Sequence, residues 1–144
     1  MKEQNYKNHA KYVIGYHVIL FGVTVALLVV SIVNLVKAIN HHINLLQPSM
    51  FILIAIAFVM LFIYVRGFPL AVQDRVIRTE ENLRHFILTG KLLDTDLTLP
   101  QIIALRFAAD EEFIALTERA IKDKLTNKEI KAAISKWKAD HHRA

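Results

Sequence analysis

From Val13 to Val36 the chain reads VIGYHVILFGVTVALLVVSIVNLV, a run that contains no Asp, Glu, Lys or Arg. As a helix this run would be about 36 Å long at roughly 1.5 Å per residue. That length exceeds the hydrocarbon core of a bilayer, which is about 30 Å thick. The length and the lack of charge together predict a membrane-spanning helix over residues 13–36.

A second uncharged run, MFILIAIAFVMLFIYV, covers Met50 to Val65. Proline suits the first turn of a helix because it has no N–H to leave unpaired there, so we expect this helix to begin at Pro48. From 48 to 65 it would cover about 27 Å. Two buried helices of a soluble protein are the alternative, but the rest of the chain offers only short amphipathic stretches to cover them. We therefore predict a second membrane-spanning helix over residues 48–65.

The composition separates the chain into an apolar and a charged part. The 144 residues are 54% hydrophobic, and 18 Lys and Arg stand against 13 Asp and Glu, for a formal net charge of +5. All of these charged residues lie outside the two uncharged runs. The chain has no cysteine, which excludes a disulfide scaffold, a zinc–cysteine module and a thiol enzyme.

The short connection between the two runs predicts a helical hairpin with an external loop at 37–47. Positive charges favour the cytoplasmic side of a membrane, and they flank both chain ends of the hairpin, whereas the loop has only Lys37. We expect a multi-pass protein of the inner membrane with residues 1–12 and 66–144 in the cytoplasm. A cleaved signal peptide is disfavoured, because the first run is too long and no small-x-small site precedes Lys37. The orienting charges are Lys7, Lys11, Arg66, Arg75 and Arg78.

Small and polar residues follow a pattern along the first run. His17, Thr24 and Ser31 recur every seven residues, an interval that keeps side chains near one face of a helix. With neighbouring small residues they form a candidate packing seam, expected to make interhelical hydrogen bonds with the second span, a copy of this chain or a foreign subunit. A proton path is the alternative, but His17 lies near the headgroups and the second span has no acidic or lysine partner. The seam comprises Gly15, His17, Gly22, Thr24, Ala26 and Ser31.

The remaining sequence predicts a small cytoplasmic helical domain. Pro69 is expected to break the second helix at residues 66–69, because proline removes a backbone donor and disfavours helix in the residue before it. Helix-start signals recur in Thr98-Leu-Pro-Gln101 and Thr126-Asn-Lys-Glu129, where a threonine precedes Gln or Glu by three residues. Asp110 is a further candidate cap, and Gly90 is a candidate stop. We expect an all-α protein with cytoplasmic helices over about 70–88, 99–108, 111–124 and 127–138.

The sequence lacks the motifs of known catalytic chemistry. It has no Gly-rich phosphate loop, no H-E-x-x-H and no nucleophile elbow. His41 and His42 lie in the external loop without a nearby carboxylate or cysteine, so we expect no metal there. The charges after the second span nearly balance, so no nucleic-acid partner is expected. We predict neither an enzyme nor a cofactor, and no small-molecule substrate is evident.

Three stretches carry a resemblance to a known family. They are PLAVQDRVIRTEE from Pro69 to Glu81, LPQIIALRFAAD from Leu99 to Asp110, and IKAAISKWKAD from Ile130 to Asp140. They resemble an uncharacterised family of small bacterial two-span inner-membrane proteins with a helical cytosolic tail. The resemblance implies a bacterial inner-membrane location and this architecture. It implies no activity and no site residues, since the family has no assigned function.

These features favour a non-enzymatic interaction protein, either an accessory subunit of a membrane complex or a homo-oligomer. One alternative is a pore-forming, holin-like hairpin, which also combines two spans, cytoplasmic ends and a charged tail. Another is a membrane-tethered regulatory tail that binds anionic lipid or nucleic acid through the basic aromatic patch around Trp137.

Overall fold

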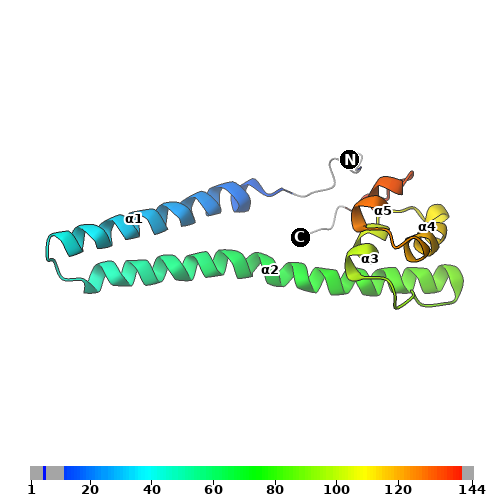
Figure 1. Cartoon of the computed structure of the whole chain (residues 1–144), viewed down its shortest axis with the longest axis horizontal. Coiled ribbons are helices and arrows are strands. Elements are labelled where there is room, and N and C mark those ends of the chain that lie inside the picture. Colours follow the sequence, from blue (N-terminus) through cyan, green and yellow to red (C-terminus); the bar gives the residue numbers. More distant parts are fainter. Residues whose placement is uncertain (1–4, 6–11, 141–144) are drawn as a thin grey trace. The chain divides into compact units, whose positions relative to one another are not determined.

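The computed structural model describes Asn5 and residues 12–140, and every regular element in this part of the chain is a helix (Figure 1). The all-α class is confirmed. The described residues form two compact units, 12–69 and 70–140, and the long helix α2 contributes to both. The elements are a π-helix, η1 (Gly15–Leu20), and the α-helices α1 (Phe21–Asn40), α2 (Leu46–Thr89), α3 (Leu99–Leu105), α4 (Asp110–Lys122) and α5 (Asn127–Ala133).

In the unit of residues 12–69, α1 and the first part of α2 run side by side in opposite directions (Figure 1). Small side chains are buried in this unit: Ala38 is 4% and Ala55 is 0% exposed. Helix α1 continues past residue 36 to Asn40, and α2 begins at Leu46. The connecting loop is therefore shorter than the expected 37–47.

Two helical segments, Gly15–Asn40 and α2, are long and apolar enough to cross a membrane. In each, only 11% of the most apolar window is buried. A core helix of a soluble protein of this apolar character would be mostly buried, because its apolar surface would otherwise face water. The two uncharged runs therefore remain candidate membrane spans.

Helix α2 continues through Pro69, so the expected break at residues 66–69 is wrong. Proline holds φ near the helical value, and its missing N–H removes one backbone bond, the one to the carbonyl of Val65. Long apolar helices tolerate such a loss. The stop signal at Gly90 is confirmed: α2 ends one residue earlier, and Gly90 adopts a left-handed φ of 73°. The helix expected at 70–88 is thus the second part of α2.

Helices α3, α4 and α5 enclose the apolar core of the unit of residues 70–140. Phe107, Phe113, Leu105 and Ile130 are its largest fully buried side chains. Trp137 packs on this core, with its ring centroid 5.0 Å from that of Phe107.

Both predicted capping boxes are confirmed. The backbone N–H of Thr98 donates to Oε1 of Gln101 over 2.8 Å, and that of Thr126 donates to Oε2 of Glu129 over 2.7 Å. These bonds satisfy donors that a helix start leaves open. The expected cap at Asp110 is wrong, because Ala109 occupies the cap position and Asp110 is the first residue of α4.

Helices α3 and α5 end earlier than expected, because residues 107–109 pair with residues 136–138. The N–H of Lys138 donates to the carbonyl of Phe107 over 2.8 Å, and the N–H of Ala109 donates to the carbonyl of Lys136 over 3.1 Å. An extended segment at each side makes this pairing possible, so α3 ends at Leu105 instead of 108 and α5 ends at Ala133 instead of 138. Helix α4 covers Asp110–Lys122 instead of 111–124.

Glu112 holds the C-terminal extended segment against α4. Its carboxylate accepts hydrogen bonds from the backbone N–H groups of Ser135, over 3.0 Å, and Lys136, over 2.9 Å. Partial burial would raise the pKa of Glu112, but the bonds from Lys136 and Ser135 outweigh it, and the pKa falls below its usual value. The ionised carboxylate is therefore the form that fits the fold.

We expect Glu112→Gln to lower the free energy of unfolding by about 1–2 kcal/mol at pH 7, because a neutral amide offers one acceptor where the carboxylate offers two. A depressed pKa gives stability that is present above the unfolded-state value and is lost as pH falls through the folded-state value. The difference between wild type and variant should therefore shrink as pH falls below the ordinary value of 4.5. Urea titrations at several pH values measure it, and a pH-independent difference would contradict this role.

Candidate functional site

The structure divides the predicted packing seam of α1 between two faces of the helix. Thr24 and Ser31 are buried, with exposed fractions of 6% and 3%, and His17 is half-buried. The small residues of the seam lie on the opposite side, because an α-helix turns by about 100° per residue. These small residues are Gly15, Gly22 and Ala26, and all three are exposed.

The buried hydroxyl groups bond within their own helix. Thr24 Oγ1 donates to the carbonyl of Leu20 over 2.8 Å, and Ser31 Oγ donates to the carbonyl of Leu27 over 2.7 Å. Each hydroxyl has a single proton to donate. Neither proton is therefore available for the hydrogen bond to a second helix that the sequence suggested.

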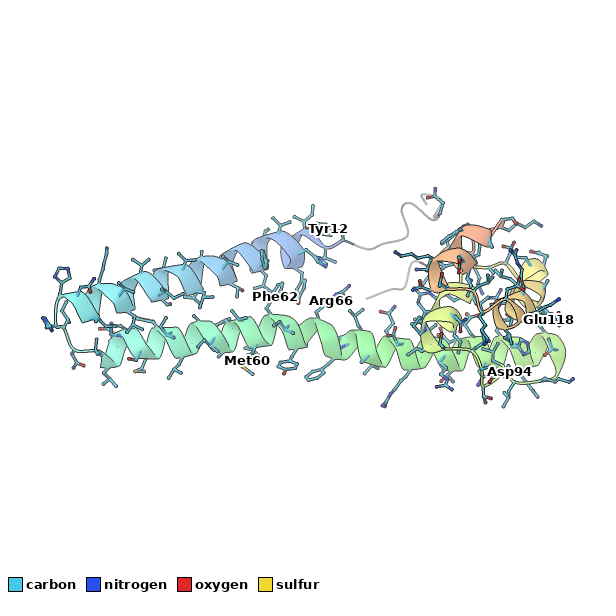
Figure 2. The ribbon with its side chains drawn as sticks, in the orientation of Figure 1. Tyr12, Met60, Phe62, Arg66, Asp94 and Glu118 are labelled. Carbon is cyan, nitrogen blue, oxygen red and sulfur yellow. The ribbon has the colours of Figure 1, made fainter. Side chains whose placement is uncertain are left out.

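Tyr16 makes a contact between the two helices that the sequence analysis missed. Its hydroxyl donates to the backbone carbonyl of Phe62 on α2, and the two rings stack at 4.7 Å with an angle of 7° between their planes. Figure 2 labels Phe62 on α2. A tyrosine near the end of an apolar run was the available signal, because a buried phenol needs a partner for its hydroxyl.

The described contacts of His17 are with residues close to it in sequence. Its ring stacks on Tyr12 at 4.6 Å, and its Nδ1 lies 3.0 Å from the carbonyl oxygen of Val13. His41 and His42 are exposed. Within the described residues, no group of three or more His, Asp or Glu side chains could hold a metal ion.

A network of charged side chains, two of them largely buried, lies where α2 meets the helices of its own unit. Arg84 on α2 donates from Nε to Asp110 over 2.7 Å, from one terminal nitrogen to Glu81 over 3.0 Å, and from the other to the carbonyl of Ala108 over 2.7 Å. Its guanidinium also lies 4.2 Å above the ring of Phe113. We call Glu81, Arg84, Asp110 and the Ala108 carbonyl the α2 joint.

Glu81 is the most enclosed acid of the α2 joint, with 7% of its surface exposed. Burial raises the pKa of Glu81, and the hydrogen bond and charge of Arg84 oppose that rise. A buried carboxylate without a partner would be costly. Arg84 therefore neutralises Glu81 within α2, and its bonds to Asp110 and to the carbonyl of Ala108 join α2 to the α3–α4 turn.

The sequence did not predict the α2 joint, because Asp110 was expected to cap a helix and not to bind Arg84. The (i, i+3) spacing of Glu81 and Arg84 was the local signal, since residues three apart lie side by side on a helix. Their other partners, Asp110 and Ala108, are distant in sequence. No local pattern could therefore identify the pair as buried.

A cavity of about 310 Å³ lies beside the α2 joint. Arg106, which is 7% exposed, pairs with Asp140 over 3.2 Å at this cavity and lies 4.6 Å above the ring of Phe107. Both acidic and basic side chains line the cavity, so its surface favours neither an anion nor a cation. The lining residues are Gln73, Val76, Ile77, Glu80, Glu81, Arg106, Lys138, Ala139 and Asp140.

The predicted orienting charges lie at the surface where they are described. Arg75 and Arg78 are exposed and Arg66 is half-buried, all on α2; Figure 2 labels Arg66. Lys7 and Lys11 lie outside the described residues.

Comparison with known proteins places the chain in a family. The model of a family of unknown function (DUF6526) matches residues 1–144, so the chain belongs to this family. No curated protein and no solved structure matches the chain.

Proposed function

We propose that this member of a family of unknown function is an integral protein of a bacterial inner membrane that acts through protein contacts and not through catalysis. The apolar helices of residues 12–69 form a two-span hairpin. The unit of residues 70–140 is a cytoplasmic interaction module. Its partners are the bilayer and protein, either further copies of this chain or a larger membrane complex.

Exposed apolar side chains support the membrane assignment. In the unit of residues 12–69, large side chains such as Val23, Val30 and Leu53 are 60%, 66% and 67% exposed. In water these side chains would be unfavourably hydrated, whereas hydrocarbon solvates them well. The helices that carry them are long enough to span a membrane.

Charge supports the orientation. Arg66, Arg75 and Arg78 follow the second candidate span, while the loop between the spans carries no arginine. Cytoplasmic segments near a span are enriched in Lys and Arg. Both ends of the hairpin therefore belong on the cytoplasmic side.

The observation that carries the interaction role is an open apolar face on α2 after Pro69. Val72, Val76, Leu83 and Phe86 are 62%, 49%, 58% and 50% exposed. Charged residues alternate with them, which disfavours a place inside the bilayer. An open apolar face outside the membrane is typical of a protein contact. The charges of the α2 joint, by contrast, are paired with one another.

A pull-down of the full-length, C-terminally tagged chain from native membranes tests the interaction role. We expect either a mass above that of the monomer in mild detergent or a co-purifying membrane protein, and Leu83→Ser should weaken the association. Leu92→Ser is the matched control, because Leu92 is 65% exposed but lies in the loop after α2. A monomer without partners, in wild type as in both variants, would contradict the proposal.

Reporter fusions test the orientation. A reporter that is active only in the cytoplasm should be active when fused after Ala144 and inactive when inserted after Asn44. Activity at Asn44 and not at Ala144 would reverse the orientation.

A further inference from the structure

The open apolar face of α2 has the spacing of a coiled-coil seam. Val72, Val76, Thr79, Leu83 and Phe86 follow one another at intervals of four, three, four and three residues. All five are exposed. Alternating intervals of three and four place side chains along one narrow stripe of a helix, the pattern with which two helices interlock.

This seam is offset from the side of α2 that the rest of its unit covers, although Val76 lies at the edge of the cavity beside the α2 joint. Ile77 and Glu81 are 5% and 7% exposed, and the side chain of Arg84 is 11% exposed, so these residues mark the side that the helical domain covers. At about 100° per residue, Leu83 lies about 160° around the helix from Glu81, about 120° from Ile77 and about 100° from Arg84. The described part of the chain therefore leaves the seam uncovered.

We propose that a second copy of this chain covers the seam, so that residues 72–87 of two α2 helices form a parallel, in-register coiled coil. This inference rests on the proposed function, since insertion in a membrane gives both copies the same direction. Val76 and Leu83 then occupy the a positions of the heptad repeat, and the d positions are occupied by Val72, Thr79 and Phe86.

Charge complementarity identifies the partner as a copy. Arg75 and Glu80 flank the seam on opposite sides, five residues apart. In a parallel coiled coil, residues so placed face each other across the two helices, so Arg75 of each copy meets Glu80 of the other. Both side chains are exposed, and within the described residues neither forms an ion pair.

The membrane anchors make so short a coiled coil feasible. An isolated helical segment of fewer than about 15 residues is only marginally stable in water. Here the segment is part of a longer helix, α2, that is already formed. Anchoring two copies in one bilayer also raises their effective concentration, as a tether does.

Cysteine crosslinking in native membranes tests the seam directly, because the chain has no cysteine of its own. Under mild oxidation, Val76→Cys and Leu83→Cys should each give at least about tenfold more disulfide-linked dimer than Arg78→Cys, since only seam positions bring two Cβ atoms within disulfide reach. Arg78 is exposed on the same helix but off the seam. Equal yields at 78 and 83, or no dimer at 76 and 83, would overturn the proposal.

Charge reversal in the Leu83→Cys background tests the register. Arg75→Glu alone and Glu80→Arg alone should each lower the dimer yield about threefold, because each places like charges opposite one another twice in the dimer. The double reversal should restore the yield. A double variant no better than the single ones would overturn the parallel register.

The two proposals fail separately. A chain that does not crosslink through the seam, yet still recovers a foreign membrane protein through Leu83, would refute the coiled coil and retain the interaction role. A monomer without partners would refute both.

Discussion

Arg84→Met is expected to lower the free energy of unfolding of the unit of residues 70–140 by about 3–5 kcal/mol at pH 7, the usual cost of removing one partner from a buried ion pair. The side chains of Arg84 and Glu81 are only 11% and 9% exposed. Without the guanidinium, Glu81 would keep a buried charge without its main partner, and the carbonyl of Ala108 would lose a donor. Methionine preserves much of the packing, so the loss reports the polar contacts.

Trp137 is a suitable probe of this unfolding. It is the only tryptophan of the chain, and it packs on Phe107 in the core. Urea titration of the full-length protein in detergent, followed by its fluorescence, gives the free energy. The matched control is Arg119→Met, because Arg119 pairs with Asp123 over 3.5 Å but is 60% exposed. The control should change stability by no more than about 0.5–1 kcal/mol. An equally small effect of Arg84→Met would show that the α2 joint contributes little.

The loss should depend on pH in a defined direction. Burial already raises the pKa of Glu81, and removal of Arg84 removes the main opposing effect. An acid whose folded-state pKa is raised favours folding as pH falls through that value, because protonation removes the buried charge. The deficit of Arg84→Met should therefore be larger at pH 7 than at pH 5, and Glu81→Gln in the same chain should reduce it. A pH-independent deficit would point to lost packing instead.

Phe113→Ala is expected to cost about 3–5 kcal/mol, as truncation of a fully buried phenylalanine does. Phe113 is 0% exposed and lies in the first turns of α4. Its ring lies under the guanidinium of Arg84, and His85 contacts it edge-on, with the centroids 6.1 Å apart. The cost therefore includes a cavity in the core and the loss of the surface on which Arg84 lies. The same fluorescence titration measures it.

Phe107→Ala separates these two contributions. Phe107 is 1% exposed, so its truncation should cost a similar amount, but the cations near its ring are Arg106 and Lys131 and not Arg84. In double-mutant cycles with Arg84→Met, the Phe113 pair should be non-additive by about 0.5–3 kcal/mol, whereas the Phe107 pair should be nearly additive. Two additive cycles would contradict the contact between Arg84 and Phe113.

Features of the fold that depend on adjacent residues could be predicted from the sequence. Each capping box, at Thr98 and at Thr126, joins residues only three positions apart. The helix end at Gly90 depends only on the backbone conformation of that glycine. The uncharged runs likewise predicted the two long helices, although both helices extend beyond the runs, to Asn40 and to Thr89. The predicted break at Pro69 was wrong, although its signal is local, because a long helix can lose one backbone hydrogen bond without ending.

Features that depend on distant residues could not be predicted. The ends of α3 and α5 follow from the pairing of residues 107–109 with 136–138, which no local pattern shows. The same is true of the α2 joint, where Arg84 reaches Asp110. In the seam of α1, periodicity identified Thr24 and Ser31 as one stripe, but Gly22 lies about 160° away on a regular helix and was wrongly grouped with them.

The pairing of residues 107–109 with 136–138 also sets an order of events during synthesis. The last contacts of the helical domain cannot form until residues 136–140 have left the ribosome. Ribosomes add about 5–20 residues per second, so the apolar segment ending at Val65 emerges roughly 4–15 s earlier. From their own emergence until that of residues 136–140, Phe107 and Phe113 lack their final cover, while the two uncharged runs have already left the ribosome. In the membrane hairpin proposed above, insertion would therefore precede completion of the domain, and the nascent domain would complete its fold on an anchored chain.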